Sequence, residues 1–457
     1  MMRRTTKHRV YQSRIAYLAI FLVVLLLSGP RVSTAKGTLL APDPTFGQDG
    51  KVQTKLETGC FPYGLAVKSD GDLIAVGYAF PDKNDFNTRV AGIVEYKSGG
   101  NRNSQFGQSG IVFNDNMIYA NAVVEQPDGE LIVEGQTVED PSPGTPTFVL
   151  ARYNPDGSLD SSFGNGGQVF DSYSKQFDGV TTLAVQSDGK ILAAGVAGTS
   201  PAGASESTGD FAIARYNPDG TLDTTFGASG KVLTDFDGGY DVIGAIFVQP
   251  NGKILTAGWV GTPPENFGIG LAQYNPDGSL DSTFGNGGKS SASLPGASEQ
   301  MSTGCMAVDS SGNIVVGGIQ YFDGGDNAKP DLVRFNSAGA LDASFGNGGR
   351  VDLSDVAGGL ISGVQIQPDG KIFVSGFGVF PYAPVPTGVF SARYNSDGTA
   401  DAAYNGGAPA LNKFYGGFGQ PYVGILQPNG DFLVAGYDRD VNVSKKLLLL
   451  RYQTGAE

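Results

Sequence analysis

Histidine is almost absent from this sequence, and its absence limits the chemistry that the chain can perform. The only histidine, His8, lies within the first 35 residues. A chain without further imidazole cannot build a Ser-His-Asp or Cys-His catalytic set, nor a zinc or iron site that needs histidine ligands. We therefore expect no histidine-dependent catalysis, and we expect neither a metal nor another cofactor.

Cysteine is also scarce, since the chain holds only Cys60 and Cys305. In an oxidising compartment two cysteines can form a disulfide, provided that their Cα atoms come within about 7 Å. The repeats described below place these two residues in the first and the fifth unit. We therefore expect two free thiols.

Basic residues are outnumbered by acidic ones. The chain has 31 Lys and Arg against 45 Asp and Glu, which gives a formal net charge of −14. Six of these bases and none of the acids lie in the first 35 residues, so the remaining chain is more acidic still. Binding to a phosphate backbone needs a basic surface. This charge balance therefore excludes nucleic acid as a partner.

One long apolar run, at 15–27, lies near the N-terminus. Basic residues precede it and Ser33-Thr34-Ala35 follows it, so residues 1–35 have the pattern of a secretory signal peptide cut after Ala35. The run is shorter than the roughly 20 apolar residues that cross a bilayer, which makes a retained signal anchor the less favoured alternative. We expect a secreted or periplasmic protein, with no membrane association unless this segment is retained.

The rest of the chain, 36–457, is an array of repeats about 60 residues long. A hairpin motif such as VQSDGKILAAG (185–195) recurs with this period, and Asp-Gly or Asn-Gly between short β-prone runs is typical of a tight β-turn. A strand ending in Arg-Tyr or a relative, as in LARYNPDG (150–157), follows it. The aromatic residue of a (L)DxxFG motif then recurs at Phe46, Phe106, Phe163, Phe226, Phe284, Phe345 and Tyr404.

These motifs predict four short antiparallel strands in every repeat, named a to d in chain order, and hence an all-β, seven-bladed β-propeller. A right-handed β-helix is the alternative, but its coils are shorter and parallel. The chain after residue 35 begins with a lone d strand, DPTFGQDGKV (43–52), and ends with a c strand, LLLLRYQ (447–453). We therefore expect the first strand to close the ring by pairing with the last blade, which removes an exposed edge.

NPDGSLDSSFGNGG (154–167), together with VQSDGKILAAG, resembles the delta-60 repeat family of bacterial, mostly secreted proteins. The resemblance covers nearly the whole chain after residue 35. It implies a propeller-like repeat domain, and it supplies no catalytic or ligand-binding residue. Departures such as NSAG (336–339) in place of NPDG affect single turns.

The repeated NPDGSLD segment raises the question of a calcium loop. Asn154, Asp156 and Asp160 match the latter part of a D-x-N-x-D-G-x-x-D pattern, and hard oxygen ligands suit Ca²⁺. The first ligand position, however, holds Arg152, whose charge opposes metal binding. A phosphate loop at 284–290 is excluded because Thr283 stands where a glycine is required. A turn capped by its own Asn and Asp side chains is the favoured interpretation.

Arginine recurs in five of the c strands, and aspartate recurs in the motif that follows. We expect an Arg–Asp ion pair inside each such blade, with the aromatic residue of the motif packing against neighbouring structure. The residues with this structural role include Arg152, Asp160, Phe163, Arg215, Asp223, Phe226, Arg393 and Asp401.

In a propeller the a–b and c–d connections lie on one face, and the b–c and d–a connections lie on the other. Here the first set consists of uniform turns, and the second set is variable and rich in aromatic and acidic residues. Loops on a rigid scaffold usually carry binding, so we expect a carbohydrate or a protein or peptide ligand on this variable face. The alternative is that these rings only plug the channel mouth. The candidate binding residues are Trp259, Tyr63, Tyr78, Phe80, Tyr240, Tyr321, Phe380, Tyr382, Tyr415 and Tyr437.

The favoured function is non-enzymatic binding or scaffolding outside the cytoplasm. One alternative is a histidine-free hydrolase or lyase, in which carboxylates such as Asp82, Asp85 or Glu265 perform acid–base catalysis. A structural component of the cell surface, or an adhesion protein, is the other.

Overall fold

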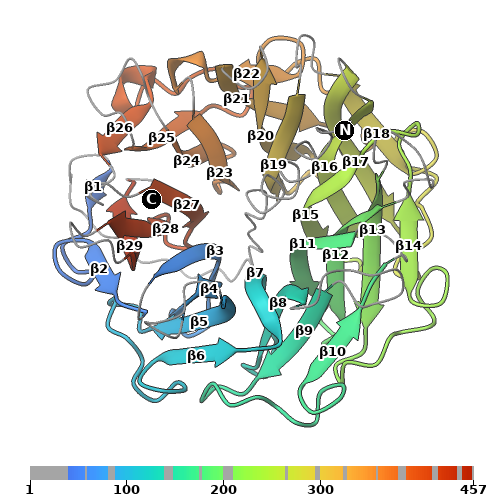
Figure 1. Ribbon diagram of the computed structural model, residues 1–457. Helices are drawn as coiled ribbons and strands as arrows, with labels where there is room; N and C mark the ends of the chain where they lie inside the picture. The colour runs from blue at the N-terminus through green and yellow to red at the C-terminus, as the bar shows by residue number, and fades with distance from the viewer. Residues whose placement is uncertain are drawn as a thin grey trace, which may run out of the picture.

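Seven antiparallel sheets surround a central axis in the computed structural model, which confirms the predicted seven-bladed β-propeller (Figure 1). The predicted signal peptide, 1–35, lies outside the described residues. Within the described part of the chain, no helix is both long and apolar enough to cross a membrane. The structure describes residues 40–56, 59–80, 88–137, 148–173, 178–198, 209–262, 266–293, 299–322, 327–356, 359–378, 388–413, 420–439 and 445–454.

Each of blades 1 to 6 runs from its innermost strand a to its outermost strand d in chain order. Blade 1 comprises β3 (Cys60–Val67), β4 (Leu73–Ala79), β5 (Val90–Tyr96) and β6 (Ile111–Asn114). Blade 2 comprises β7 (Met117–Glu125), β8 (Leu131–Thr137), β9 (Phe148–Tyr153) and β10 (Gln168–Asp171). Blade 3 comprises β11 (Asp178–Val185), β12 (Ile191–Gly198), β13 (Gly209–Tyr216) and β14 (Lys231–Thr234).

Blade 4 comprises β15 (Val242–Val248), β16 (Ile254–Thr262), β17 (Asn266–Tyr274) and β18 (Lys289–Ser293). Blade 5 comprises β19 (Glu299–Val308), β20 (Ile314–Phe322), β21 (Asn327–Phe335) and β22 (Arg350–Asp352). Blade 6 comprises β23 (Gly359–Ile366), β24 (Ile372–Gly378), β25 (Gly388–Tyr394) and β26 (Ala410–Lys413). Two short 3-10 helices, η2 (Ser354–Val356) and η3 (Asn405–Gly407), accompany blades 5 and 6.

Blade 7 is assembled from both ends of the chain. Its strands β27 (Gln420–Leu426), β28 (Phe432–Arg439) and β29 (Lys445–Gln453) come from the C-terminal end, and β1 (Ala41–Pro42) and β2 (Lys51–Thr54) from the N-terminal end pair with β29. Asp43 accepts a hydrogen bond of 2.6 Å from Nε of Arg451, 408 positions away. The predicted closure of the ring is therefore confirmed.

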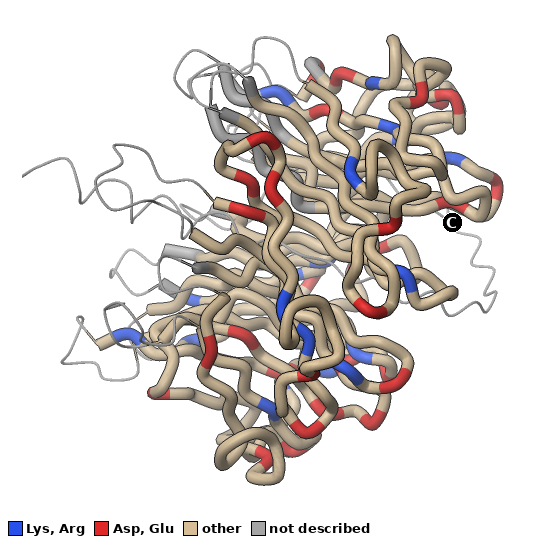
Figure 2. Tube along the Cα trace, turned by 90° about the vertical axis from the view of Figure 1, so that its right-hand side faces the viewer, with Lys and Arg blue, Asp and Glu red and all other residues tan. Residues whose placement is uncertain are grey.

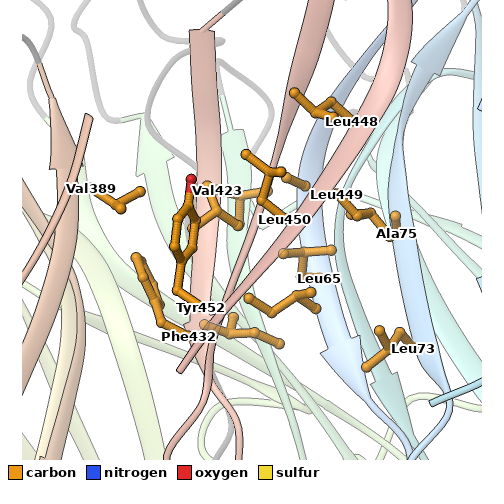
Figure 3. Packing of buried hydrophobic residues seen from close by; sticks show 14 of the residues in the cluster. Leu65, Leu73, Ala75, Val389, Val423, Phe432, Leu448, Leu449, Leu450 and Tyr452 are labelled. Carbon is orange, nitrogen blue, oxygen red and sulfur yellow. The ribbon is translucent and has the colours of Figure 1, made fainter. Parts of the chain in front are cut away.

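The hydrophobic core lies between the blades rather than within them. Figure 3 shows this packing around blade 7, where Leu449 of β29 shares a buried cluster with Leu65 and Ala75 of blade 1. Val389 of blade 6 belongs to the same buried cluster. A single blade cannot bury its two apolar faces alone, so the folded state depends on the contacts between neighbours.

The repeated motif NPDG…FG forms the joint between neighbouring blades. The N–H of Gly164, which follows Phe163 in blade 2, donates a 2.7 Å hydrogen bond to the carbonyl of Asp219 in the turn of blade 3. In that turn Gly220 has a φ of +86°, and an added Cβ would lie 2.9 Å from both the Phe163 ring and the Gly164 nitrogen. Asp219 caps its own turn through the N–H of Thr221 at 2.9 Å. These contacts give the motif a role in joining blades.

The arginine of the c strand strengthens the same joint. Nε of Arg215 donates a 2.8 Å hydrogen bond to Asp223, and Nη1 donates to the carbonyl of Pro276 in the next blade. The guanidinium carbon lies 4.4 Å from the centre of the Phe226 ring, within cation–π range. Burial alone would raise the pKa of Asp223, but hydrogen bonds from Thr225 and Lys190 and the charge of Arg215 hold that pKa below its usual value. The same arrangement of Arg, Asp and aromatic ring recurs at Arg152, Asp160, Phe163; Arg334, Asp342, Phe345; Arg393, Asp401, Tyr404; and Arg451, Asp43, Phe46.

Neither cysteine forms a disulfide among the described residues, as expected, and both are buried. Burial raises the pKa of the Cys305 thiol to about 12, so this thiol stays protonated and unreactive at neutral pH.

We predict that Gly220→Ala destabilises the propeller by about 2 kcal/mol or more, because a methyl group would collide with the Phe163 ring and the backbone of the previous blade. Gly166→Ala is the matched control. Its φ is also positive, at +62°, but nothing lies within 4 Å of the added Cβ, so only the backbone strain of about 1 kcal/mol remains. Chemical denaturation of the two variants measures the loss in the free energy of unfolding. Equal losses would contradict the close contact between the two blades at Gly220.

A double-mutant cycle on Arg215→Ala and Asp223→Ala tests the buried pair. Asp223→Ala should cost about 3 kcal/mol, because it leaves the buried Arg215 without its carboxylate, and Arg215→Ala should cost less, because Lys190 still pairs with Asp223 at 3.0 Å. The two losses should be non-additive by about 1 to 3 kcal/mol. The combination of Arg215→Ala with Asp401→Ala, in blade 6, should be additive and serves as the control. Additive losses in the first cycle would refute the pairing.

Candidate functional site

Every blade carries a β-bulge at the same point of its innermost strand. The register between strands a and b skips one residue in all seven sheets, and a bulge re-aims the side chain that it carries. In blade 1, for example, Pro62 pairs with Gly77 and Gly64 with Val76, so Tyr63 is the extra residue. The seven bulge residues are Tyr63, Asn121, Thr181, Gly244, Gly304, Ser362 and Tyr422.

The glycine that ends the hairpin motif makes the bulge possible. In blade 1, a Cβ on Gly77 would stand only 1.9 Å from the carbonyl oxygen of Phe61. In blade 2, Gly135 has the same relation to Tyr119, at 2.2 Å. The last glycine of motifs such as VQSDGKILAAG is therefore required by the close approach of the bulged strand.

An aromatic cluster occupies the variable face across blades 7, 1 and 2. We define the aromatic cluster as Phe61, Tyr63, Tyr78, Phe80, Tyr119, Tyr422 and Tyr437. These residues lie near the beginnings of β3, β7 and β27 and near the ends of β4 and β28, and all of these strand ends meet the d–a or b–c connections.

The rings of the aromatic cluster are in direct contact. Phe61 stacks on Tyr78 at a centroid distance of 4.8 Å and meets the edge of Tyr437 at 5.0 Å. Tyr63 is the centre of the group, since its ring lies 5.6 Å from Tyr78, 5.7 Å from Tyr119 and 6.4 Å from Tyr422. Such tilted and edge-to-face pairs are the favourable geometries for aromatic side chains.

The aromatic cluster is part core and part surface. Tyr78 and Tyr437 are buried, and the five other members are partly exposed. A crevice lined by Phe61, Tyr78 and Leu447, among others, has a volume of about 10 Å³, the space of about one water molecule. The partly exposed rings therefore offer a ligand a platform over their outer faces.

Four of the ten candidate binding residues thus come together, namely Tyr63, Tyr78, Phe80 and Tyr437. Trp259 and Tyr240 form a separate pair in blade 4, with ring centroids 5.1 Å apart. Trp259 is only 2% exposed and packs in the core between blades, so it offers no exposed platform. Tyr321 lies in β20, but only its backbone is described. The candidates Phe380, Tyr382 and Tyr415, and the carboxylates Asp82, Asp85 and Glu265, lie outside the described residues.

Beside the aromatic cluster, Glu134 is a buried carboxyl group that the sequence reasoning missed. Its side chain is 1% exposed, and one oxygen, Oε2, has no hydrogen-bond partner among the described residues. Burial raises the pKa of Glu134 well above its usual value, against a hydrogen bond from Asn121 that lowers it. Burial therefore disfavours the charged form of this group. Alignment of the repeats could have singled it out, because the equivalent positions are Val76, Ala194, Ala257, Gly317, Ser375 and Ala435.

A second polar group lies on the variable face between blades 3 and 4. Asp210, Asp235 and Asp241 each place one carboxylate oxygen within 4.8 Å of the others, so the three residues could hold a metal ion or share a proton. Asp241 is fully buried and accepts hydrogen bonds from the N–H groups of Phe236 at 2.7 Å and Gly261 at 3.2 Å. Burial raises the pKa of Asp241 to about 7, opposed by these two bonds and reinforced by the neighbouring carboxylates.

We predict that Asp241 makes the stability of the protein fall as the pH rises. Its pKa is 3.8 as an ordinary carboxyl and about 7 in the folded protein, so between these values the unfolded chain loses the proton that the folded protein keeps. The thermal midpoint should fall between about pH 4 and pH 7 and level off above. In Asp241→Asn this part of the fall should disappear, whereas Asp237→Asn, at an exposed position of the same connection, should retain it. Thermal unfolding scans between pH 4 and pH 8, in the presence of a chelator, measure these midpoints. Equal pH profiles for the unmodified protein and both variants would contradict the assignment of this pH dependence to Asp241.

Comparisons with known proteins agree with the fold. Five stretches of the chain match the family described as "Domain of unknown function (DUF5122) beta-propeller", at 126–163, 186–226, 249–284, 310–345 and 367–404. Each stretch runs from the a–b turn to the aromatic residue of the (L)DxxFG motif, in blades 2 to 6. The delta-60 name suggested by the motifs stays a prediction. A comparison with curated proteins found no match.

Solved structures with similar folds are distant. A protein of unknown function from Dyadobacter fermentans is 16% identical, with 73% of this chain and 93% of that chain covered and a TM-score of 0.38. The propeller domain of the trilobed protease from Pyrococcus furiosus is 11% identical, covering 85% and 93%, with a TM-score of 0.42. Drosophila semaphorin 1a is 9% identical, covering 88% of both chains, with a TM-score of 0.43. Likenesses this distant carry no argument about function. The chain is a seven-bladed β-propeller, and the repeats of its blades 2 to 6 match the DUF5122 beta-propeller family.

Proposed function

We propose that this protein is a non-enzymatic binding or scaffold propeller that acts outside the cytoplasm, and that its ligand docks on the aromatic cluster. The observation that supports this proposal is the convergence of seven aromatic side chains from three blades at the variable face, five of them partly exposed. The signal-like segment 1–35 motivates the location.

The chemistry of tyrosine supports a binding role. Its ring offers a large apolar face and its hydroxyl group offers a hydrogen bond, which is why tyrosine is enriched in interfaces. Two of the rings, Tyr63 and Tyr422, stand at bulge positions of adjacent blades, where the equivalent residues of blades 4 and 5 are glycines. If the fold required a large side chain at the bulge, every blade would carry one, but blades 4 and 5 have glycine there. The ligand class is a carbohydrate or a protein or peptide.

We predict that Tyr63→Ala and Tyr422→Ala each weaken ligand binding about tenfold or more, because each removes a central ring of the platform. Tyr240→Ala is the matched control, since Tyr240 is also a partly exposed tyrosine but lies in blade 4. Glycan and peptide arrays identify a ligand, isothermal titration measures the affinities, and thermal unfolding verifies that each variant is folded. Folded Tyr63 and Tyr422 variants that bind like the unmodified protein would refute the proposal.

A carboxylate-dependent hydrolase or lyase is the second candidate. The trio of Asp210, Asp235 and Asp241 favours it, because a carboxyl that keeps its proton near neutral pH beside carboxylates suits acid–base catalysis. The complete burial of Asp241 weighs against it, since a catalytic acid has to reach its substrate. Turnover that disappears in Asp241→Asn while binding is retained would favour this candidate over the first.

A further inference from the structure

Arg89 stands at the edge of the aromatic cluster. It precedes β5, and because Ala79 of β4 pairs with Val90, Arg89 lies at the level of Phe80. Its side chain is exposed, and its guanidinium carbon lies 5.1 Å from the centre of the Tyr78 ring. A guanidinium group that rests on an aromatic face is held in place while its N–H groups at the edge remain able to donate.

Arg89 brings a positive charge to the aromatic cluster. Among the described residues no Asp or Glu forms an ion pair with it. Burial raises the pKa of the Glu134 carboxyl beside the cluster well above its usual value, which disfavours its charged form. The protein as a whole is acidic, with a net charge of −14, and Figure 2 shows acidic positions spread along the described chain. An exposed arginine on an aromatic platform is therefore a specific feature of this face.

We infer that the ligand of the aromatic cluster is an acidic carbohydrate, with a uronate carboxylate bound to Arg89 and the sugar rings lying on Tyr63, Phe80 and their neighbours. This inference rests on the proposed function and narrows its ligand class. Arginine matches the planar, two-oxygen geometry of a carboxylate. The flat face of a pyranose ring can stack on the face of a single aromatic side chain, and the partly exposed rings of the cluster come from three blades. An acidic peptide would use the arginine but would not require several ring faces beside it.

The test compares matched ligands and matched variants. Defined oligogalacturonates and oligomannuronates are titrated against the whole protein, beside the same oligosaccharides after chemical reduction of their carboxylates to alcohols. The acidic forms should bind at least about tenfold more tightly than the reduced forms, and added salt should weaken only the acidic forms. Arg89→Gln should remove this preference, and Arg89→Lys should restore part of it. Arg102→Gln removes an exposed positive charge from the c–d connection of blade 1, on the opposite face, and should leave the preference unchanged.

Different failures point to different conclusions. Equal affinity for the acidic and reduced sugars, unchanged binding in Arg89→Gln, or no binding of either uronate series would each overturn the acidic-carbohydrate inference. The proposed function would survive these results if Tyr63→Ala and Tyr422→Ala still abolished binding of another ligand from the arrays. Arg89-dependent binding of acidic peptides in place of uronates would also overturn the inference and assign the same site to a protein partner.

Discussion

The structure depends on one recurring backbone hydrogen bond between neighbouring blades. In it, the glycine that follows the aromatic residue of the (L)DxxFG motif donates its N–H to a carbonyl in a turn of the next blade. It occurs at six of the seven joints, with distances of 2.7 to 2.8 Å, from Gly47, Gly107, Gly164, Gly227, Gly285 and Gly346. At the joint of blades 6 and 7 the hydroxyl of Tyr404 donates to the carbonyl of Thr454 at 3.0 Å instead. Because the apolar faces are buried only between blades, the register of these joints determines how well the core packs.

The charged groups beside this hydrogen bond differ between blades, but each buried charge keeps a partner of opposite sign. Blade 1 has the reverse polarity, since Glu95 stands where other blades have arginine and is paired with Lys68 at 3.2 Å. In blade 4 the arginine is replaced by Gln273, and Lys253 supplies the positive charge to Asp281 at 2.7 Å. Burying one charge alone would cost several kcal/mol, so a change of one partner requires a change of the other. The recurring Arg–Asp pair is therefore one of several combinations of charged residues that can be buried beside the backbone hydrogen bond of the joint.

The seven blades, the closure of the ring and the Arg–Asp pairing follow from the sequence because each has a local signal. The hairpin turns indicate where the strands begin and end, and the repeat period gives the number of blades. Arg215 and Asp223 are only eight positions apart, so their pairing is local. The joints are harder to predict, since Gly164 and Asp219 belong to different repeats and their contact depends on the curvature of the ring. The bulges have only an indirect signal, the glycine that ends each hairpin motif. Trp259 shows that an aromatic residue near a variable connection can be buried as readily as exposed.

The bulges are the place where a nearly symmetric ring becomes asymmetric. The backbone offers seven equivalent positions beside the central axis, and the chain fills them with tyrosine in blades 7 and 1, asparagine in blade 2 and glycine in blades 4 and 5. Repetition of the joints preserves the fold, and the bulged residue takes no part in those joints. The bulge positions can therefore differ between blades without changing the joints, and at Thr181 the bulge side chain adds a hydrogen bond of 2.6 Å to the carbonyl of Ile243 in blade 4. Binding specificity can then arise on blades 7, 1 and 2 while the other blades keep the ring closed around them.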